Sequence, residues 1–190
     1  MNFWERNSVY WDLDYNKRVV TVRDYQAELH QQKALRLITG HFQQHLHTVV
    51  YLHGRPGTGK SMIGLLLAKK LEGHFCKSWN PTEPSDRLAK VYQAVSPTRK
   101  NPLILVLEEF DGIIKKIING KLEHKHISIP VKDKASWNSM LDDINLGLYP
   151  NLILVLTSNQ GPEWVRQQDK SFIREGRVDI IRELDGQHHQ

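Results

Sequence analysis

A glycine-rich segment in the first third of the chain has the residue types and spacing of a phosphate-binding loop. Residues 54–61 match the pattern G-x-x-x-x-G-K-[ST]. The glycines let backbone N–H groups point at phosphate oxygens, and a helix that begins there directs its positive dipole end at the same anion. Lys60 would neutralise charge on the terminal phosphates and Ser61 would coordinate Mg²⁺. The alternative is a glycine-rich turn that holds no ligand. The candidate nucleotide-binding residues are Gly54, Arg55, Pro56, Gly57, Thr58, Gly59, Lys60 and Ser61.

Two adjacent carboxylates, Glu108 and Glu109, come directly after an apolar run at 103–107. If that run is a central strand, both lie at its carboxyl edge, where open α/β sheets bind ligands. One of the two could then hold Mg²⁺ through its water shell while the other polarises an attacking water. The competing interpretation is an acidic turn after a buried strand.

Further polar residues follow a second apolar run, at 152–157. Asn159 would lie level with the terminal phosphate and could hold the water there, or it could simply turn the chain. Arg174 and Arg177 lie three positions apart. If they approach a neighbouring subunit's nucleotide, each could stabilise the charge that develops on the transferred phosphoryl group. Otherwise they belong to a solvated face.

These residues need a frame in which several strands end at one edge. The runs at 103–107 and 152–157 are apolar throughout rather than alternating, which is typical of central parallel strands covered on both faces. Strands that alternate with helices predict an α/β fold, a three-layer α/β/α sandwich around a parallel sheet. Asp24 is expected to cap the first helix. The other strands are expected at 18–22, 48–52 and 75–79, and the helices at 24–44, 61–71, 85–95 and 137–146.

The chain is expected to have two parts, an N-terminal arm and helix at 1–47 and a core with the phosphate loop at 48–190. Five aromatic residues stand near the N-terminus. We expect their rings to pack the arm onto the domain or onto a neighbouring subunit, the alternative being an arm that binds another partner. They are Phe3, Trp4, Tyr10, Trp11 and Tyr15.

Composition narrows the class of protein. Of the 190 residues, 39% are hydrophobic and 25% charged, which is the makeup of a globular domain rather than a disordered or disulfide-rich chain. Cys76 is the single cysteine, so no intramolecular disulfide can form, which fits the cytoplasm or another reducing compartment. The longest apolar run, 62–68, is far shorter than the ~20 residues of a membrane span. The N-terminus also lacks the pattern of a cleaved secretory signal.

Much of the net charge of +5 comes from one segment. Residues 112–134 contain six lysines against Glu123 and Asp133, and the Asn119-Gly120 pair within them is a hairpin signal. This basic segment would be either a contact for polypeptide or nucleic acid, or an exposed insertion kept soluble by its lysines.

Taken together, these motifs resemble the AAA+ ATPases, and within them the classic AAA branch, over about residues 48–182. A finer detail, Asp86-Arg87-Leu88 ahead of a helix, is similar to the group that contains the mitochondrial translocase of the Rieske iron–sulfur protein. The matching segments look like Walker A (54–61), Walker B (105–111), sensor 1 (156–159) and the arginine-finger segment (169–179).

The resemblance implies a Mg²⁺-dependent ATPase that binds and hydrolyses ATP in a ring oligomer, a hexamer when active. Such a machine remodels or translocates a macromolecule, here polypeptide rather than nucleic acid. By position, Ser61 and Glu108 serve the metal and Glu109 is the general base. The other implied catalytic residues are Asn159 as sensor 1, with Arg174 and Arg177 as fingers that act in trans. The alternatives are a non-hydrolysing nucleotide-binding assembly module and, third, a P-loop small-molecule kinase.

Three departures from the family pattern bear on activity. Glu108 stands where most members have Asp, and Glu175 replaces the usual Pro between the arginines. Only 180–190 remain after the finger segment, and we expect them to be too few for the small helical lid that normally follows, so that the chain would be either a natural minimal module or a truncated one. We therefore expect weak nucleotide affinity and poor assembly of the isolated chain. In a ring, the segment 79–85, with Trp79 as its only aromatic, would line the pore together with the basic segment.

Overall fold

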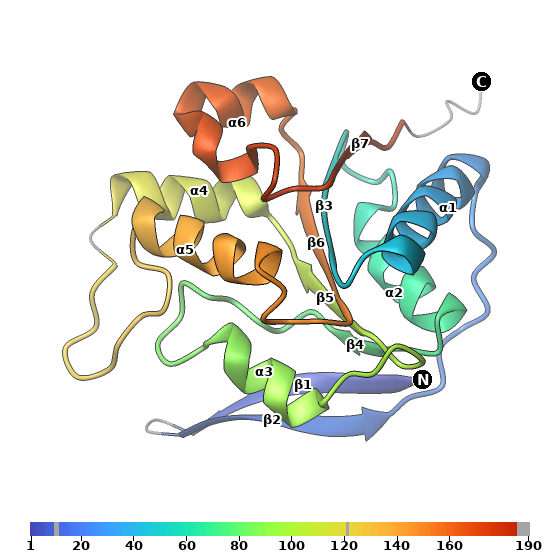
Figure 1. Cartoon of the computed structure of the whole chain (residues 1–190), viewed down its shortest axis with the longest axis horizontal. Coiled ribbons are helices and arrows are strands. Elements are labelled where there is room, and N and C mark those ends of the chain that lie inside the picture. The colour runs from blue at the N-terminus through green and yellow to red at the C-terminus, as the bar shows by residue number, and fades with distance from the viewer. Residues whose placement is uncertain (10–11, 121, 186–190) are drawn as a thin grey trace.

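The computed structural model of the chain describes residues 1–9, 12–120 and 122–185, which form a seven-stranded sheet with helices around it (Figure 1). The strands are β1 (Asn2–Val9), β2 (Asp12–Val19), β3 (Thr48–His53), β4 (His74–Cys76), β5 (Leu103–Leu107), β6 (Leu152–Ser158) and β7 (Ile180–Glu183). Their order in the sheet is β2-β1-β4-β5-β6-β3-β7. β1 and β2 form an antiparallel hairpin, and the other neighbouring strands run parallel.

Helices cover both faces of this sheet (Figure 1). They are α1 (Leu29–Gln44), α2 (Lys60–Lys70), α3 (Leu88–Val95), α4 (Phe110–Asn119), α5 (Lys134–Asn145), α6 (Pro162–Asp169) and the 3₁₀ helix η1 (Lys170–Ile173). α1 and α2 pack on one face, and α3 to α6 with η1 pack on the other. The predicted three-layer α/β/α sandwich is therefore confirmed.

Alternate residues of each central strand belong to two separate cores. In β5, Leu103, Leu105 and Leu107 join the core beneath α3 to α6, whereas Ile104 and Val106 join the core beneath α1 and α2. No residue of β5 is more than 3% exposed. β6 is divided between the two cores in the same way. Burial on both faces explains why these two runs are apolar throughout.

The first helix begins later than its sequence pattern predicts. Asp24 does not cap it, because α1 starts at Leu29 with Glu28 as its N-cap. Glu28 and Gln31 form a capping box in which the Glu28 N–H donates to Gln31 Oε1 at 2.9 Å. Asp24 instead pairs with Lys69 on α2. Residues 20–22, expected to be strand, also lie outside β2.

The loop after β4 leaves the sheet sooner than predicted and folds inward. Residues 77–79 are not strand, and α3 begins at Leu88 rather than at residue 85. The Trp79 ring is 1% exposed and packs in the core beneath α3 to α6. Asp86, fully buried, accepts from the Asn80 N–H at 2.8 Å and holds the loop closed. The segment 79–85 therefore does not present its aromatic ring to a pore.

The basic segment begins with a helix, so the predicted hairpin at Asn119-Gly120 is wrong. α4 continues to Asn119, and its Ile113, Ile114 and Ile117 side chains are buried at helical spacing. This apolar face outweighs the local turn preference of Asn-Gly, since burial of three isoleucines stabilises the helix far more than a turn type does.

The N-terminal arm forms the hairpin and extends the sheet past β4. Tyr15 is 4% exposed and Trp4 packs beside it in one core, while Phe3 packs against the other core. Tyr15 Oη donates to Asp86 at 2.5 Å, and Arg6 pairs with the same carboxylate at 2.9 Å. For these three rings the structure confirms packing onto the domain. Tyr10 and Trp11 lie outside the described residues.

Candidate nucleotide-binding site

The candidate site lies at the edge of the sheet where β5, β6 and β3 end side by side. Each strand carries one of the predicted motifs directly after it, so parallel pairing alone brings the three motifs together. A pocket of about 440 Å³ opens there. Its lining includes Pro56, Gly57, Gly59, Lys60, Ser61, Glu108, Glu109 and Asn159.

The loop at 54–61 has a conformation that depends on glycine. Gly57 and Gly59 have φ angles of 83° and 79°, in the left-handed region that side chains disfavour. Gly59 is also the N-cap of α2, so no capping side chain occupies the first N–H groups of that helix. Thr58 Oγ1 donates to the Arg55 carbonyl at 3.0 Å and braces the turn. The N–H groups at the start of α2 are thus left available to an anion.

Gly54 is not among the residues that line this pocket, and it fits against the backbone of Leu184, the residue directly after β7. A Cβ atom added to Gly54 would lie 2.5 Å from the Leu184 carbonyl oxygen, and its φ is 139°. Gly54 is therefore required for close backbone approach.

Lys60 is held at the centre of the site by three oxygen atoms. Its Nζ donates to the carbonyls of Gly54 and Arg55 at 2.7 and 2.8 Å and to Asn159 Oδ1 at 3.0 Å. Lys60 is only 8% exposed, and burial lowers the pKa of its amine while nearby Asp111 opposes that change. The contact with Asn159 joins the first motif to the third.

The two carboxylates differ in backbone and exposure. Glu108 is half-buried, whereas Glu109 is exposed and has a φ of 53° and a ψ of 45°. A left-handed conformation at a residue other than glycine costs about 1–3 kcal/mol and tends to occur at functional sites. Glu109 is also the N-cap of α4, so this left-handed residue forms the turn from β5 into the helix.

A hydrogen bond between Asp111 and Ser158 ties the second motif to the third, and the sequence analysis assigned neither residue a role although both stand in the predicted segments. Ser158 Oγ donates to Asp111 Oδ1 at 2.7 Å, and the Gln160 N–H donates to Ser158 Oγ at 3.0 Å. Tyr51 Oη donates to the Gln160 carbonyl at 2.6 Å. These bonds fix the loop that carries Asn159. The sequence signal that could have indicated a role for Asp111 was its position two residues after the Glu108-Glu109 pair.

The start of α1 supports the phosphate loop from behind, and this too was not predicted. His30 Nε2 lies 3.1 Å from the Thr58 carbonyl oxygen, and Gln31 Nε2 donates to the Gly59 carbonyl at 3.4 Å. The approach is close, because a Cβ added to Gly59 would lie 2.3 Å from Gln31 Nε2. No motif in the sequence marks these two side chains.

The two arginines lie apart from this pocket. Arg177 is 7% exposed, with its Nε and Nη2 donating to the two oxygens of Asp142 at 2.7 and 2.8 Å. These hydrogen bonds lower the pKa of the Asp142 carboxyl. The Arg174 side chain is 58% exposed and approaches Asp142 only to 3.8 Å. Among the residues that the structure describes, the lining of the phosphate pocket within one chain includes neither Arg174 nor Arg177.

Comparison of the chain with known protein families gives a match that agrees with this site. The model of the AAA family, described as the ATPase family associated with various cellular activities, matches residues 50–185. The chain belongs to the AAA family. The matched range runs from β3 through β7 and so contains all four predicted motifs of the AAA chain. Family membership implies a nucleotide-binding ATPase domain. A search among curated proteins found no match.

Two properties of the AAA chain concern metals and membranes. Over the ranges that the structure describes, no three His, Cys, Asp or Glu side chains cluster as a metal site. Mg²⁺ usually keeps several waters and takes one or two protein ligands beside substrate phosphates, and Ser61 and Glu108, which line the pocket, fit this mode of coordination.

None of the helices in the described residues has the length and apolar content to cross a membrane.

Proposed function

We propose that this AAA chain binds ATP with Mg²⁺, hydrolyses it, and uses the cycle to remodel or translocate a macromolecule as part of an oligomer. The observation that carries the proposal is the convergence of Lys60, Glu109 and Asn159, from three neighbouring strands, on one pocket. Phosphate binding alone would need only Lys60. Hydrolysis also needs a base and an amide that positions the attacking water, which are the roles proposed for Glu109 and Asn159.

Each residue then has a distinct role. The N–H groups at the start of α2 hold the phosphates, and Lys60 exchanges its carbonyl partners for phosphate oxygens. Ser61 and Glu108 would hold Mg²⁺, which neutralises phosphate charge when bound. Glu109 accepts the proton of the attacking water, and Asn159, already bonded to Lys60, orients that water.

We propose that Arg174 and Arg177 belong to a finger segment that acts on a neighbouring subunit's nucleotide. The Arg174 side chain is 58% exposed and only loosely paired with Asp142, so its guanidinium is accessible to a neighbouring subunit. The Nε and Nη2 atoms of Arg177 both donate to the Asp142 carboxylate, so we assign Arg177 the role of holding the segment in position. A hexameric ring is the assembly in which every nucleotide meets such a segment.

The macromolecule is proposed to be polypeptide rather than nucleic acid. Several lysines of the basic segment are already engaged within the chain: Lys134 donates to Asp169 at 2.7 Å, and Lys115 lies 5.5 Å from the centre of the Trp164 ring. The segment therefore offers less free positive charge than its sequence indicates. Cys76 is buried as a thiol, and a reducing compartment such as the cytoplasm is part of the proposal.

A non-hydrolysing assembly module is the second candidate. It is favoured by Glu175, exposed between the two arginines, where its negative charge would oppose charge stabilisation by either one. This candidate predicts nucleotide binding without turnover.

The deciding experiment measures phosphate release from ATP over a series of protein concentrations. Specific activity should rise with concentration and fall about 100-fold or more in Glu109→Gln and in Arg174→Ala. Arg182→Ala, which removes an exposed arginine on β7, is the matched control and should keep full activity. ATP binding without turnover at every concentration would favour the assembly module. Turnover that is unchanged in Glu109→Gln would contradict the proposed base.

A further inference from the structure

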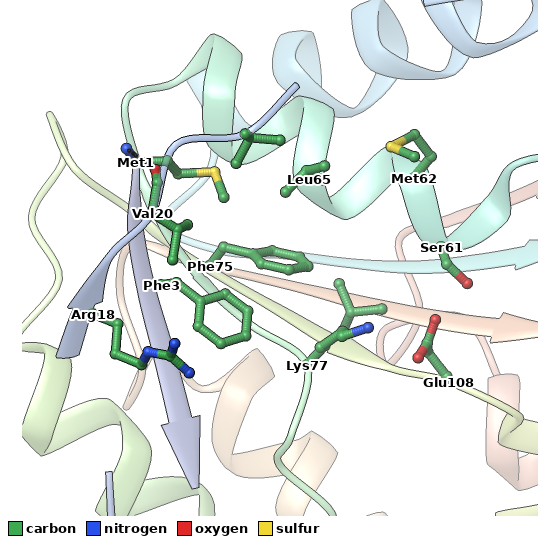
Figure 2. A pocket seen from close by; sticks show the side chains of 12 residues that line it. Met1, Phe3, Arg18, Val20, Ser61, Met62, Leu65, Phe75, Lys77 and Glu108 are labelled. Atoms are coloured by element: carbon green, nitrogen blue, oxygen red, sulfur yellow. Dashed lines mark hydrogen bonds between the residues drawn. The ribbon is translucent and has the colours of Figure 1, made fainter. Parts of the chain in front are cut away.

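A second cavity adjoins the phosphate pocket on the side of the N-terminal hairpin (Figure 2). We name it the hairpin pocket; it lies between β1, α2 and the ends of β4 and β5, and its volume is about 370 Å³. Ser61, Met62 and Glu108 line both cavities, so the two are neighbours with a shared wall. None of the proposed steps of ATP hydrolysis uses the hairpin pocket.

One side of the hairpin pocket is hydrocarbon and aromatic. Phe3 and Phe75 form its floor, with their ring centres 5.8 Å apart, and Leu65 and Met62 line it from α2 (Figure 2). α2 packs on β4, β5 and β6, and the sheet continues beyond the helix into β1. The cavity lies where that helical cover ends, and Val20 closes it at the far side.

The other side carries two cationic side chains at one edge and a carboxylate at one end. Figure 2 shows Arg18 and Lys77 along the edge next to Phe3, and Glu108 with Ser61 at the end that adjoins the phosphate pocket. Arg18 pairs with Glu5 at 2.8 Å, and Lys77 is exposed. Cavities of this size with apolar walls and a few polar groups are the usual form of a small-molecule site.

We propose that the hairpin pocket binds a small amphipathic carboxylate. Its hydrocarbon part lies on Phe3, Phe75 and Leu65, and its carboxylate lies at the cationic edge, where Lys77 is the principal partner. A cationic amphiphile of the same length should bind much more weakly, because its hydrocarbon part would meet the same apolar walls but its head would lie beside Lys77 and Arg18.

The volume sets the size of the probe. A water molecule takes about 30 Å³ in the liquid, so 370 Å³ corresponds to about a dozen non-hydrogen atoms. Decanoate has this size and combines an unbranched chain with one carboxylate. It is therefore the probe, and decyltrimethylammonium is its counterpart of opposite charge.

The experiment is calorimetric titration of the full chain with each probe in the absence of nucleotide. Decanoate should bind saturably at one site per chain and decyltrimethylammonium should bind much more weakly. Lys77→Met should weaken decanoate binding about tenfold, since it removes a charge-assisted contact. Lys100→Met removes another exposed lysine outside the pocket lining and should change nothing.

A second pair of variants tests the apolar side. Val22→Trp places a large ring in a pocket-lining position on an irregular segment and should abolish binding, whereas Gln26→Trp in the same exposed segment should leave it intact. Equal binding of both probes, or unchanged affinity for decanoate in Val22→Trp, overturns the proposal. So does decanoate binding that is seen only when the protein is dilute enough for its oligomers to dissociate. No nucleotide is used, so failure here leaves the proposed ATPase untouched.

Discussion

The backbone of Glu109 lies in the left-handed region at the residue proposed as the general base. Because glycine adopts that conformation without strain, we predict that Glu109→Gly raises the free energy of unfolding by about 0.5–1 kcal/mol while phosphate release is lost. Urea denaturation and the ATPase assay measure the two effects. Such a result would mean that the site retains strain because the carboxylate is needed there.

Glu72 supplies the control for this prediction. It also has a positive φ, of 50°, and it is exposed at the end of α2, outside the phosphate pocket. Glu72→Gly should gain a similar stability and keep its activity. If Glu109→Gly is instead less stable than the wild type, then its carboxylate contributes to folding and the strain argument fails.

Single residues were predictable from the sequence where chemistry dictates their type. The motifs that contain Lys60 and Glu109 follow neighbouring parallel strands, and both residues line the pocket as that arrangement predicts, while their chemical roles stay predictions. Asp111 and His30 were not predictable in this way. Their partners, Ser158 and the Thr58 carbonyl, are distant in sequence and become neighbours only in the folded sheet.

At the scale of elements, the N-terminus of α1 serves both helix and phosphate loop through Gln31. Its Oε1 completes the capping box with Glu28, and its Nε2 donates to the Gly59 carbonyl. We predict that Gln31→Ala lowers the free energy of unfolding by about 1 kcal/mol and also weakens nucleotide binding several-fold, because the loop loses its support. Thermal unfolding and binding of a fluorescent ATP analogue measure these changes.

Gln32 is the matched control for Gln31. It is the next residue on the same helix, and its Nε2 donates to the Ala27 carbonyl at 2.8 Å rather than to the glycine-rich loop. Gln32→Ala should leave nucleotide affinity at the wild-type value. Equal loss of affinity in both variants would show that general loosening of α1, rather than the contact with Gly59, is responsible.

Strands and helices were predictable from the sequence where a single physical effect, such as burial, determined their residue pattern. The strands at 103–107 and 152–157 follow from burial on both faces. The start of α1 was misplaced because Asp24 is the better N-cap by residue type, whereas the helix begins after Glu28, where Gln31 forms the capping box and also contacts a loop that lies 28 residues away. The Asn119-Gly120 turn failed for a similar reason, since α4 gains more by burying its isoleucines.

At the scale of the whole molecule, one buried carboxylate joins the N-terminal hairpin to the rest of the domain. Asp86 accepts from Tyr15 Oη, from Arg6 and from the Asn80 N–H. Burial raises the pKa of this carboxyl, and its three donors oppose that change. The hairpin and the loop after β4 are therefore held by the same group, although they lie about 70 residues apart in the chain.

We predict that Tyr15→Phe lowers the free energy of unfolding by about 1–3 kcal/mol, because it leaves a buried carboxylate with one donor fewer. Amide hydrogen exchange should accelerate in β1 and β2 more than in β5. Tyr25→Phe removes the hydroxyl of an exposed tyrosine and serves as the control. Uniform acceleration across the sheet would show that the hairpin and the central strands open as one unit.

The position of β3 in the sheet has a consequence for the order of events during synthesis. β3 lies between β6 and β7, and both neighbours are translated about 100 residues or more after it. A nascent chain that has left the ribosome only as far as β5 already contains the whole glycine-rich loop, yet the loop has no strand on either side to hold it. Because a domain generally folds as a unit, we expect the loop to bind nucleotide only after β6 and β7 have been translated.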